Sequence, residues 1–204
     1  MTLGGHASIG RGVIVYLHGF RSSPQSRKAS LLRQRLQQRG MAGHYLCPAL
    51  PASPRAAAQL ALELAQSLMT QQLAIIGSSL GGYYATWLAE RLGCRAVLLN
   101  PAIDPARDLQ AHIGHQTVFF SEDQIDFRAE YIGQLGELAT RVTRPERYFL
   151  IAATGDAVID YRTMIAKYAG ARQHVIEGSD HELSDFEKYV DEVLVFCDAT
   201  WEMQ

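Results

Sequence analysis

The amino-acid sequence predicts an α/β protein with a doubly wound sheet of about six mostly parallel strands and helices on both faces. Short apolar runs alternate along the chain with longer segments of helical period, and a glycine or proline follows each run within two residues. The 204 residues are 48% hydrophobic and 20% charged, which is enough apolar material for a core. Because domains commonly contain about 100–200 residues, we expect one domain over residues 1–204.

Four uninterrupted apolar runs predict strands that are buried on both faces, as in a parallel sheet covered by helices. These runs span residues 13–17, 73–76, 96–99 and 149–153. Two shorter runs, at 44–47 and 174–176, are weaker strand candidates. Pro48 ends the first of them and Gly178 follows the second, so both are expected to be short.

The segment after the run at 44–47 predicts an amphipathic helix with a defined start. Ser53 is a suitable N-cap, and Pro54 suits the first helical position. Leu60, Leu64 and Leu68 recur every four residues, and we expect them to form the buried face of this helix.

Two further helices are expected near the ends of the chain. Leucines within residues 31–36 form an apolar stripe, and Gly40 ends that helix. Near the C-terminus, Ser184 and Glu187 have the spacing of a capping box, and apolar residues follow at helical intervals.

Residues 101–147 interrupt the alternation of strands and helices. They contain no convincing buried strand, are rich in Asp, Glu, Gln and Arg, and include Pro101 and Pro105 at their start. We interpret them as a short helical excursion after the strand that ends near Asn100. They would form a lid-like insertion over the edge of the sheet and not a second domain.

The composition argues against several classes of function. A formal net charge of −2 gives no basic footprint for nucleic acid. No run of about 18 apolar residues could span a membrane, and residues 1–12 lack the apolar stretch of a secretory signal. The three cysteines, Cys47, Cys94 and Cys197, are too few and too scattered for a disulfide framework or a zinc site. We therefore expect a cytoplasmic protein without a metal or organic cofactor.

Residues 77–81 form a Gly-x-Ser-x-Gly pattern centred on Ser79. A predicted buried strand enters this pattern and a helix-like segment leaves it, which is the arrangement of a nucleophile elbow. Such a turn presents the serine hydroxyl at the carboxyl edge of the sheet, at a helix N-terminus that favours negative charge. The alternative is a tightly packed glycine-rich turn. Ser78 is not a candidate, because its frame would require glycine at Ile76 and Leu80.

A serine nucleophile needs a base, and the base needs an acid that orients it. With this elbow the expected chain order is serine, carboxylate, histidine, each just past a strand. Asp156 and His181 have these positions, although a turn aspartate and a surface histidine are the alternatives. Asp160 is better placed to cap a helix, and Asp180 is adjacent to His181, so we expect Asp156 to orient the imidazole.

Acyl transfer also requires two backbone N–H donors for the oxyanion. We expect one from Leu80, directly after Ser79. The other is expected from Phe20, in the loop after the first predicted strand. His18 in the same loop is expected to brace it and not to act as a base.

Other side chains near these motifs are weaker candidates. Arg21 follows the oxyanion loop and Tyr83 follows the elbow, so both are candidate substrate-binding residues. A solvated charge and core packing are the alternatives, and Tyr84 is as well placed as Tyr83 to line a pocket. His112 and His115 lie three apart, but no further metal-ligand pattern follows them.

Five short motifs form a set. They are YLHGF at 16–20, GSSLGGYYAT at 77–86, NPA at 100–102, GDAVIDY at 155–161 and EGSDH at 177–181. This set resembles the YqiA-like esterase family of small α/β-hydrolases, over about residues 13–197. The resemblance implies an α/β-hydrolase fold, serine esterase activity and a triad of Ser79, Asp156 and His181. Arg21 stands where a small polar residue such as Asn is usual in that family.

The leading hypothesis is a serine esterase or thioesterase that acts on a small-molecule acyl ester or thioester. One alternative is an acyltransferase that uses the same three residues and differs only in the acceptor of the acyl group. The other is a binding protein that keeps the hydrolase fold without turnover.

Overall fold

The computed structural model describes residues 12–68, 72–119 and 124–198. Residues 1–11, on which the predicted lack of a secretory signal rests, lie outside this part of the chain. Among the described helices, none combines the length and the apolar character needed to cross a lipid bilayer.

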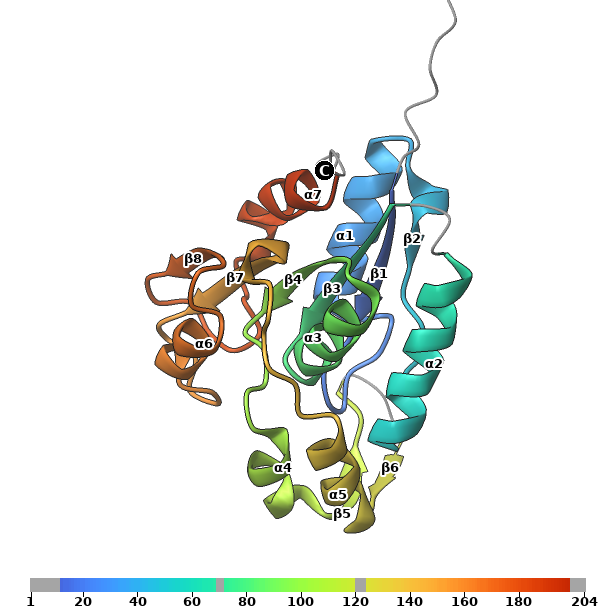
Figure 1. The fold of residues 1–204 in the computed structure, drawn as a ribbon, viewed down its shortest axis with the longest axis vertical. Helices are drawn as coiled ribbons and strands as arrows, with labels where there is room; N and C mark the ends of the chain where they lie inside the picture. The colour runs from blue at the N-terminus through green and yellow to red at the C-terminus, as the bar shows by residue number, and fades with distance from the viewer. Residues whose placement is uncertain (1–11, 69–71, 120–123, 199–204) are drawn as a thin grey trace, which may run out of the picture.

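A six-stranded parallel sheet lies at the centre of the molecule (Figure 1). Its strands are β1 (Val13–Leu17), β2 (Tyr45–Leu46), β3 (Leu73–Ser78), β4 (Arg95–Leu99), β7 (Tyr148–Ala153) and β8 (Arg172–Ile176). They lie in the order β2-β1-β3-β4-β7-β8, and every neighbouring pair is parallel. The four strong apolar runs are the central strands and the two weak ones are the edges. The predicted fold class is therefore confirmed.

Helices cover both faces of this sheet (Figure 1). Helices α1 (Arg27–Gln38) and α7 (Val190–Asp198) lie on one face, and α2 (Pro54–Ser67), α3 (Leu80–Leu92) and α6 (Tyr161–Lys167) lie on the other. Helices α4 (Pro105–Asp108) and α5 (Glu130–Glu137) lie beyond the end of the sheet, at the bottom of Figure 1. Side chains alternate along a strand, so Val15 joins the core under α2, α3 and α6, whereas Ile14 joins the core under α1 and α7. Apolar residues at every strand position are thus needed to fill two cores.

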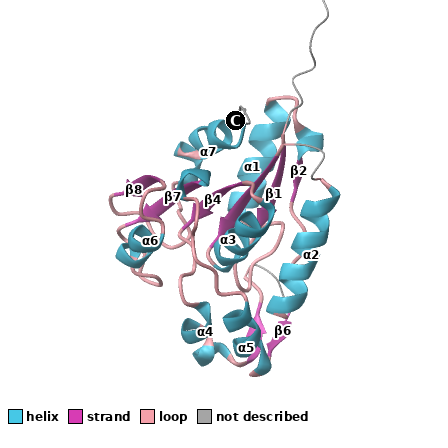
Figure 2. Cartoon of the chain, viewed as in Figure 1, coloured by secondary structure: helices cyan, strands magenta, loops and turns pink. Residues whose placement is uncertain are grey.

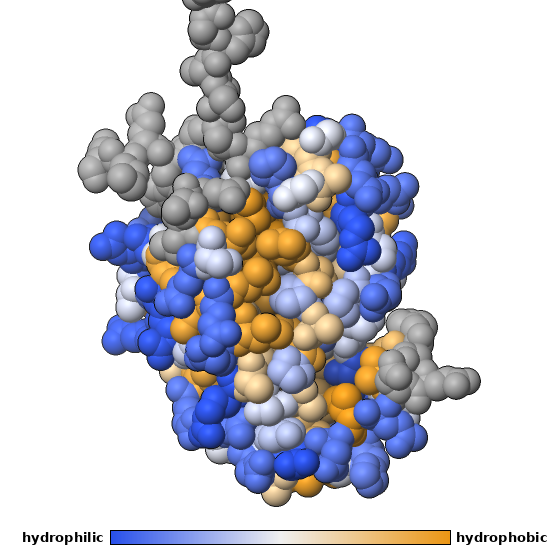
Figure 3. Space-filling model, turned by 90° about the vertical axis from the view of Figure 1, so that its right-hand side faces the viewer, coloured by the Kyte–Doolittle hydropathy of each residue, from blue (hydrophilic) through white to orange (hydrophobic). Residues whose placement is uncertain are grey.

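Helix α2 buries alanines and not the predicted leucine stripe. Ser53 caps the helix as predicted, since its Oγ accepts the Ala56 N–H at 3.4 Å. The buried positions, however, are Pro54, Ala57, Ala58, Ala61 and Ala65. Leu60 is 39% exposed, and Leu64 and Leu68 are only partly buried. Small side chains let the helix lie close to its neighbours, which moves the leucines to the flank. Hydrophobic residues gather on the side of the molecule where α2 lies (Figure 3).

The C-terminal helix begins later than the predicted capping box. A 3₁₀ turn at Phe186–Lys188 precedes α7, and Ser184 caps neither element. Instead, the Ser184 N–H donates to Asp180 Oδ1 at 3.0 Å. The capping-box prediction for Ser184 and Glu187 was wrong, because the 3₁₀ turn begins after Asp185 and α7 only at Val190, so Ser184 is not the N-cap of a helix.

The excursion at 101–147 is only partly helical. Besides α4 and α5 it contains an antiparallel pair, β5 (Gly114–Thr117) and β6 (Gln124–Phe127), seen at the bottom of Figure 2. Apart from Phe127, the strand residues alternate between half-buried and exposed positions, so no continuous apolar run marks them. Phe127 is fully buried and packs edge-on against Phe20, with ring centroids 5.0 Å apart. The excursion therefore lies over the end of β1.

Candidate active site

Ser79 forms the sharp turn between β3 and α3. Its backbone has φ 52° and ψ −120°, a region that non-glycine residues rarely adopt. The Ser79 N–H donates to the Leu99 carbonyl of β4 at 3.0 Å, and the Gly82 N–H donates to the Ser79 carbonyl at 2.9 Å. The sheet and the helix thus hold the strained turn from both sides.

Two glycines of the turn are explained by close backbone packing. A Cβ on Gly77 would collide with the backbone of Gly81, and a Cβ on Gly81 would collide with the Leu17 carbonyl at the end of β1. Neither position has room for a side chain. The elbow consequently packs against the loop that follows β1.

Two hydrogen bonds join His181 to Ser79 and Asp156, which follow three different strands. His181 Nε2 lies 3.0 Å from Ser79 Oγ, and His181 Nδ1 lies 2.7 Å from Asp156 Oδ2. An ionised carboxylate can only accept, so Nδ1 carries the proton and donates to Asp156. Nε2 is then free to accept the proton of the serine hydroxyl. The structure brings the three residues expected from the sequence together in one line.

The carboxylate of Asp156 is held by more than the imidazole. Its side chain is fully buried, and Oδ1 accepts two backbone N–H groups just downstream, at 2.8 and 2.9 Å. The competing carboxylates are engaged elsewhere. Asp160 caps α6 by accepting the Arg162 N–H at 2.9 Å, as expected, and Asp180 accepts the Ser184 N–H.

The loop after β1 lies beside the serine. A Cβ on Gly19 would lie 3.2 Å from Ser79 Cβ and 3.7 Å from Ser79 Oγ. Within the part of the chain that the structure describes, the N–H groups of Phe20 and Leu80 have no hydrogen-bond acceptor. Both are available to an oxygen atom bound near Ser79.

His18 braces this loop, as expected. The Leu50 N–H donates to His18 Nε2 at 3.0 Å, so Nδ1 carries the proton and donates to the Gly19 carbonyl at 3.0 Å. Burial lowers the pKa of His18, which favours this neutral ring. In a trans peptide the C=O and N–H point in opposite directions. By holding the Gly19 carbonyl, His18 also fixes the direction of the Phe20 N–H.

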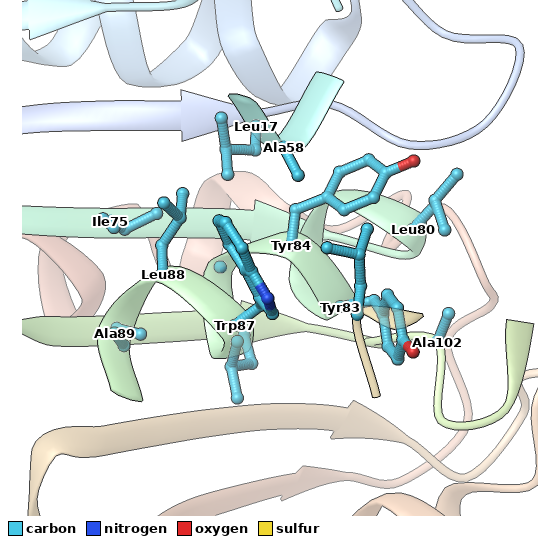
Figure 4. Packing of buried hydrophobic residues seen from close by; sticks show 14 of the residues in the cluster. Leu17, Ala58, Ile75, Leu80, Tyr83, Tyr84, Trp87, Leu88, Ala89 and Ala102 are labelled. Carbon is cyan, nitrogen blue, oxygen red and sulfur yellow. The ribbon is translucent and has the colours of Figure 1, made fainter. Parts of the chain in front are cut away.

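A small cavity of about 50 Å³ adjoins these N–H groups. Its walls come from the loop after β1, the segment after β2, the start of α3 and the excursion. They are formed by His18, Gly19, Phe20, Arg21, Ser22, Leu50, Pro51, Ala52, Leu80, Tyr84, Val118 and Ile125. Figure 4 shows the Tyr84 ring extending from α3 between Leu17 and Leu80. The predominantly apolar walls suit an apolar group attached to a reacting carbonyl.

Arg21 lines this cavity, but its guanidinium has partners within the protein. Arg21 Nε donates to the Thr117 carbonyl at 2.7 Å, and the guanidinium lies over the Phe119 ring at 4.5 Å. The Phe119 N–H in turn donates to the Arg21 carbonyl at 2.7 Å. Arg21 thereby ties the loop after β1 to the excursion, and its binding of substrate stays a prediction.

Tyr83 does not line the cavity, so the cavity does not support its selection as a substrate-binding candidate, which stays a prediction. Its ring is buried on the Ala102 side of α3 (Figure 4), and its hydroxyl donates to the Leu135 carbonyl at 2.7 Å. Burial raises the pKa of Tyr83 to about 12. Adjacent helix residues point about 100° apart. Only one of the two tyrosines can therefore face the cavity, and that residue is Tyr84.

A family model described as "Uncharacterised protein family (UPF0227)" matches residues 13–198. The chain belongs to this family. The match runs from β1 to α7 and includes every residue of the site described above. It confirms the resemblance to the YqiA-like family.

Solved structures resemble this UPF0227 chain over most of their length. A protein of Agrobacterium vitis S4 described as a hydrolase has a TM-score of 0.73 and 16% identity, covering 92% of this chain and 88% of its own. Est1E from Butyrivibrio proteoclasticus with ferulic acid bound has a TM-score of 0.68 and 14% identity, covering 90% and 88%. A monoacylglycerol lipase from Paleococcus ferrophilus has a TM-score of 0.63 and 17% identity, covering 92% and 95%. These similarities establish the α/β-hydrolase fold.

Two buried polar side chains of the UPF0227 chain were not among the predicted site residues. Asn100 is fully buried, and its Nδ2 donates to the carbonyls of Asp180 and His181. Lys28 is 5% exposed and donates to the carbonyl of Glu182. The sequence offered a signal for Asn100, which ends a buried strand within one of the motifs. The helical pattern of α1 gives none for Lys28.

Other candidate ligands and nucleophiles lie apart from this arrangement. In the described ranges no three His, Cys, Asp or Glu side chains are grouped closely enough to hold a metal ion. His112 packs edge-on against Phe20, and His115 is an exposed residue of β5. Burial raises the pKa of Cys47 to about 11 and that of Cys94 to about 12, so both thiols are protonated near neutral pH.

Proposed function

We propose that this chain is a serine hydrolase of acyl esters or acyl thioesters that works through an acyl-enzyme intermediate. The observation that carries the proposal is the hydrogen-bonded line Ser79–His181–Asp156. A hydroxyl, a base and a buried acid in this order turn a weak nucleophile into an effective one.

In the first half-reaction, His181 Nε2 removes the Ser79 proton as Oγ attacks the acyl carbonyl carbon. The carbonyl oxygen becomes an oxyanion and accepts hydrogen bonds from the N–H groups of Phe20 and Leu80. Asp156 stabilises the imidazolium that forms and keeps the ring oriented. His181 then gives its proton to the leaving alcohol or thiol as the bond to the acyl carbon breaks.

In the second half-reaction, water takes the place of the leaving group. His181 removes a proton from the water, whose oxygen attacks the acyl carbon of the Ser79 ester. The second tetrahedral intermediate uses the same two N–H donors. Its collapse releases the carboxylic acid, and the proton on His181 returns to Ser79 Oγ.

The apolar walls of the cavity beside Leu80 favour a substrate whose acyl group is apolar. A monoacylglycerol lipase with the same fold supports an acyl ester as the substrate class. The proposed partner is thus a small-molecule acyl ester or thioester, and the cytoplasmic location and independence from cofactors remain predictions.

An acyltransferase would share every step up to the acyl-enzyme and differ only in the acceptor. A binding protein without turnover would not need a buried carboxylate that orients a histidine toward a strained serine. The full burial of Asp156 and its three hydrogen bonds therefore favour catalysis.

A fluorophosphonate probe tests the proposal directly, because it phosphonylates only an activated serine. Wild-type protein should be labelled, and Ser79→Ala should not. Ser78→Ala is the matched control, since it removes the same atom from the neighbouring residue and should still be labelled. Labelling of Ser79→Ala, or no labelling of wild type, would contradict the proposal. Release of free acid in water, compared with acyl transfer to added alcohols, separates hydrolase from transferase.

A further inference from the structure

We propose that Asn100 and Lys28 are positioning residues that hold the His181 loop in its reactive geometry by binding three consecutive backbone carbonyls. The carbonyls belong to Asp180, His181 and Glu182. This inference rests on the proposed function, because it concerns the base of that reaction.

The loop that carries His181 has an unusual backbone. Gly178 has φ 72°, Ser179 has φ 57° and Leu183 has φ 49°. For residues other than glycine, such conformations are strained and persist only where the surroundings impose them. The base therefore lies on a segment whose shape is not maintained by its own local preferences.

Asn100 acts on the two peptide groups that flank the His181 Cα. Its Nδ2 donates to the Asp180 carbonyl at 2.9 Å and to the His181 carbonyl at 3.1 Å. The first carbonyl belongs to the peptide before His181 and the second to the peptide after it. Holding both peptide planes fixes φ and ψ of His181, and with them the direction of its Cα–Cβ bond.

Asn100 is itself rigidly held. Its Oδ1 accepts the Ala153 N–H at 2.9 Å, and its own N–H donates to the Ile151 carbonyl at 2.9 Å. Its φ is 42°, a region that asparagine tolerates better than most residues. One buried amide thus connects the ends of β4 and β7 to the histidine loop.

Lys28, on α1, holds the next carbonyl. Its Nζ donates to the Glu182 carbonyl at 2.6 Å and to Glu182 Oε2 at 2.9 Å. The Lys28 side chain is 6% exposed, whereas that of Glu182 is 73% exposed. A lysine is rarely buried without a partner, and the shorter of the two Lys28 hydrogen bonds goes to this loop carbonyl.

The expected consequence is a loss of catalytic rate without a loss of substrate binding. A displacement of about 1 Å of a reacting group can cost about 10²-fold in rate. Asn100→Asp keeps the acceptor for the Ala153 N–H but removes both donors to the loop. It should lower kcat by roughly 10- to 100-fold with KM within about twofold, and should slow fluorophosphonate labelling by the same factor. Lys28→Met should lower kcat by a smaller factor, because it acts one peptide further from His181.

Two control variants separate positioning from general destabilisation. Tyr148→Phe removes a buried hydroxyl that binds Glu90 near the start of β7, far from the histidine loop. It should lower the melting temperature with kcat within twofold. Glu182→Gln removes the ion pair of Lys28 but leaves its bond to the carbonyl, so it should also keep kcat within about twofold. An equal loss in Glu182→Gln and Lys28→Met would contradict the role of the carbonyl bond.

A cycle with His181→Ala provides the decisive measurement. In that background Asn100→Asp should still lower the melting temperature but should not reduce the residual turnover further. A reduction by the same factor in both backgrounds would overturn the inference, since the loss would not pass through His181. An unlabelled wild type would overturn the proposed function and this inference together. Rapid labelling of both wild type and Asn100→Asp would overturn this inference alone.

Discussion

The carboxyl edge of the six-stranded sheet and the excursion at 101–147 contribute to the site in different ways. Ser79 follows β3 directly, whereas Asp156 and His181 lie in the loops after β7 and β8, and backbone hydrogen bonds between neighbouring strands and loops fix their positions. Among its described residues, the excursion contributes Val118 and Ile125 to the cavity wall, and at its start the Ala102 N–H donates to the Ser79 carbonyl at 2.9 Å. It is tied to the loop after β1 by a few contacts.

This difference suggests a division of roles. Reacting groups must keep their relative positions within a fraction of an ångström, and a parallel sheet with two buried faces provides that rigidity. A cavity wall has only to match the size and polarity of the bound group, which a small exposed sheet can do. We expect substitutions at the sheet edge to change rate and substitutions in the excursion to change selectivity.

The largest effect is expected at the nucleophile. Ser79→Ala should lower kcat for an ester by about 10⁶-fold while the protein stays folded, because only one hydroxyl is lost. Steady-state kinetics and a melting curve check both parts. More than a tenth of wild-type turnover would mean that the sheet edge does not carry the reaction.

The orienting acid should come second. Asp156→Asn should lower kcat by up to about 10⁴-fold, because an amide favours the wrong imidazole tautomer. Asp160→Asn is the matched control, and kcat should stay within severalfold of wild type. If the large kinetic defect appeared in Asp160→Asn instead, the assignment of the acid would be wrong.

A smaller effect, on selectivity, is expected in the excursion. Ile125→Ala enlarges the cavity, so the ratio of kcat/KM for a hexanoyl ester to that for an acetyl ester should rise by about 5- to 10-fold. Ile113→Ala is the control, since Ile113 is 46% exposed and does not line the cavity. An equal shift in both variants would argue against acyl binding in this cavity.

The smallest effect concerns stability alone. Asp160→Ala removes the cap of α6 and should cost about 0.5–2 kcal/mol. That corresponds to a fall of a few degrees in melting temperature for a domain of this size. Calorimetry on the variant measures the fall, and unchanged kcat would separate helix capping from the chemistry next to it. A large loss of kcat would show that Asp160 does more than cap.

Much of the sheet edge was predictable from sequence because the relevant signals are local. Buried parallel strands need continuous apolar runs, and the elbow needs glycines where backbones touch. A serine, a carboxylate and a histidine in this chain order, each after a predicted strand, then identify the candidate triad. Ser79, Asp156 and His181 were found in this way, and the structure brings them within hydrogen-bonding distance.

The features that were missed depend on tertiary contacts. Whether α2 buries its alanine face or its leucine face depends on how closely the helix approaches the sheet. The spacing of apolar residues within the helix does not determine that distance. Strands β5 and β6 bury one another only partly and so lack an apolar run. Lys28 meets Glu182 across 154 positions of sequence, and no local pattern records such a contact.

The positive φ angles have a consequence for how the protein responds to heat. In the described ranges the non-glycine residues with positive φ are Arg21, Ser79, Asn100, Ser179 and Leu183, and all of them lie in loops around the site. Each conformation costs about 1–3 kcal/mol, whereas a whole domain is stable by only about 5–15 kcal/mol. Segments under such strain open at lower free energy than the strands beneath them. Moderate heat or denaturant should therefore abolish turnover reversibly while the parallel sheet is still intact. On heating, turnover should fall at a lower temperature than the circular dichroism signal of the helices and strands.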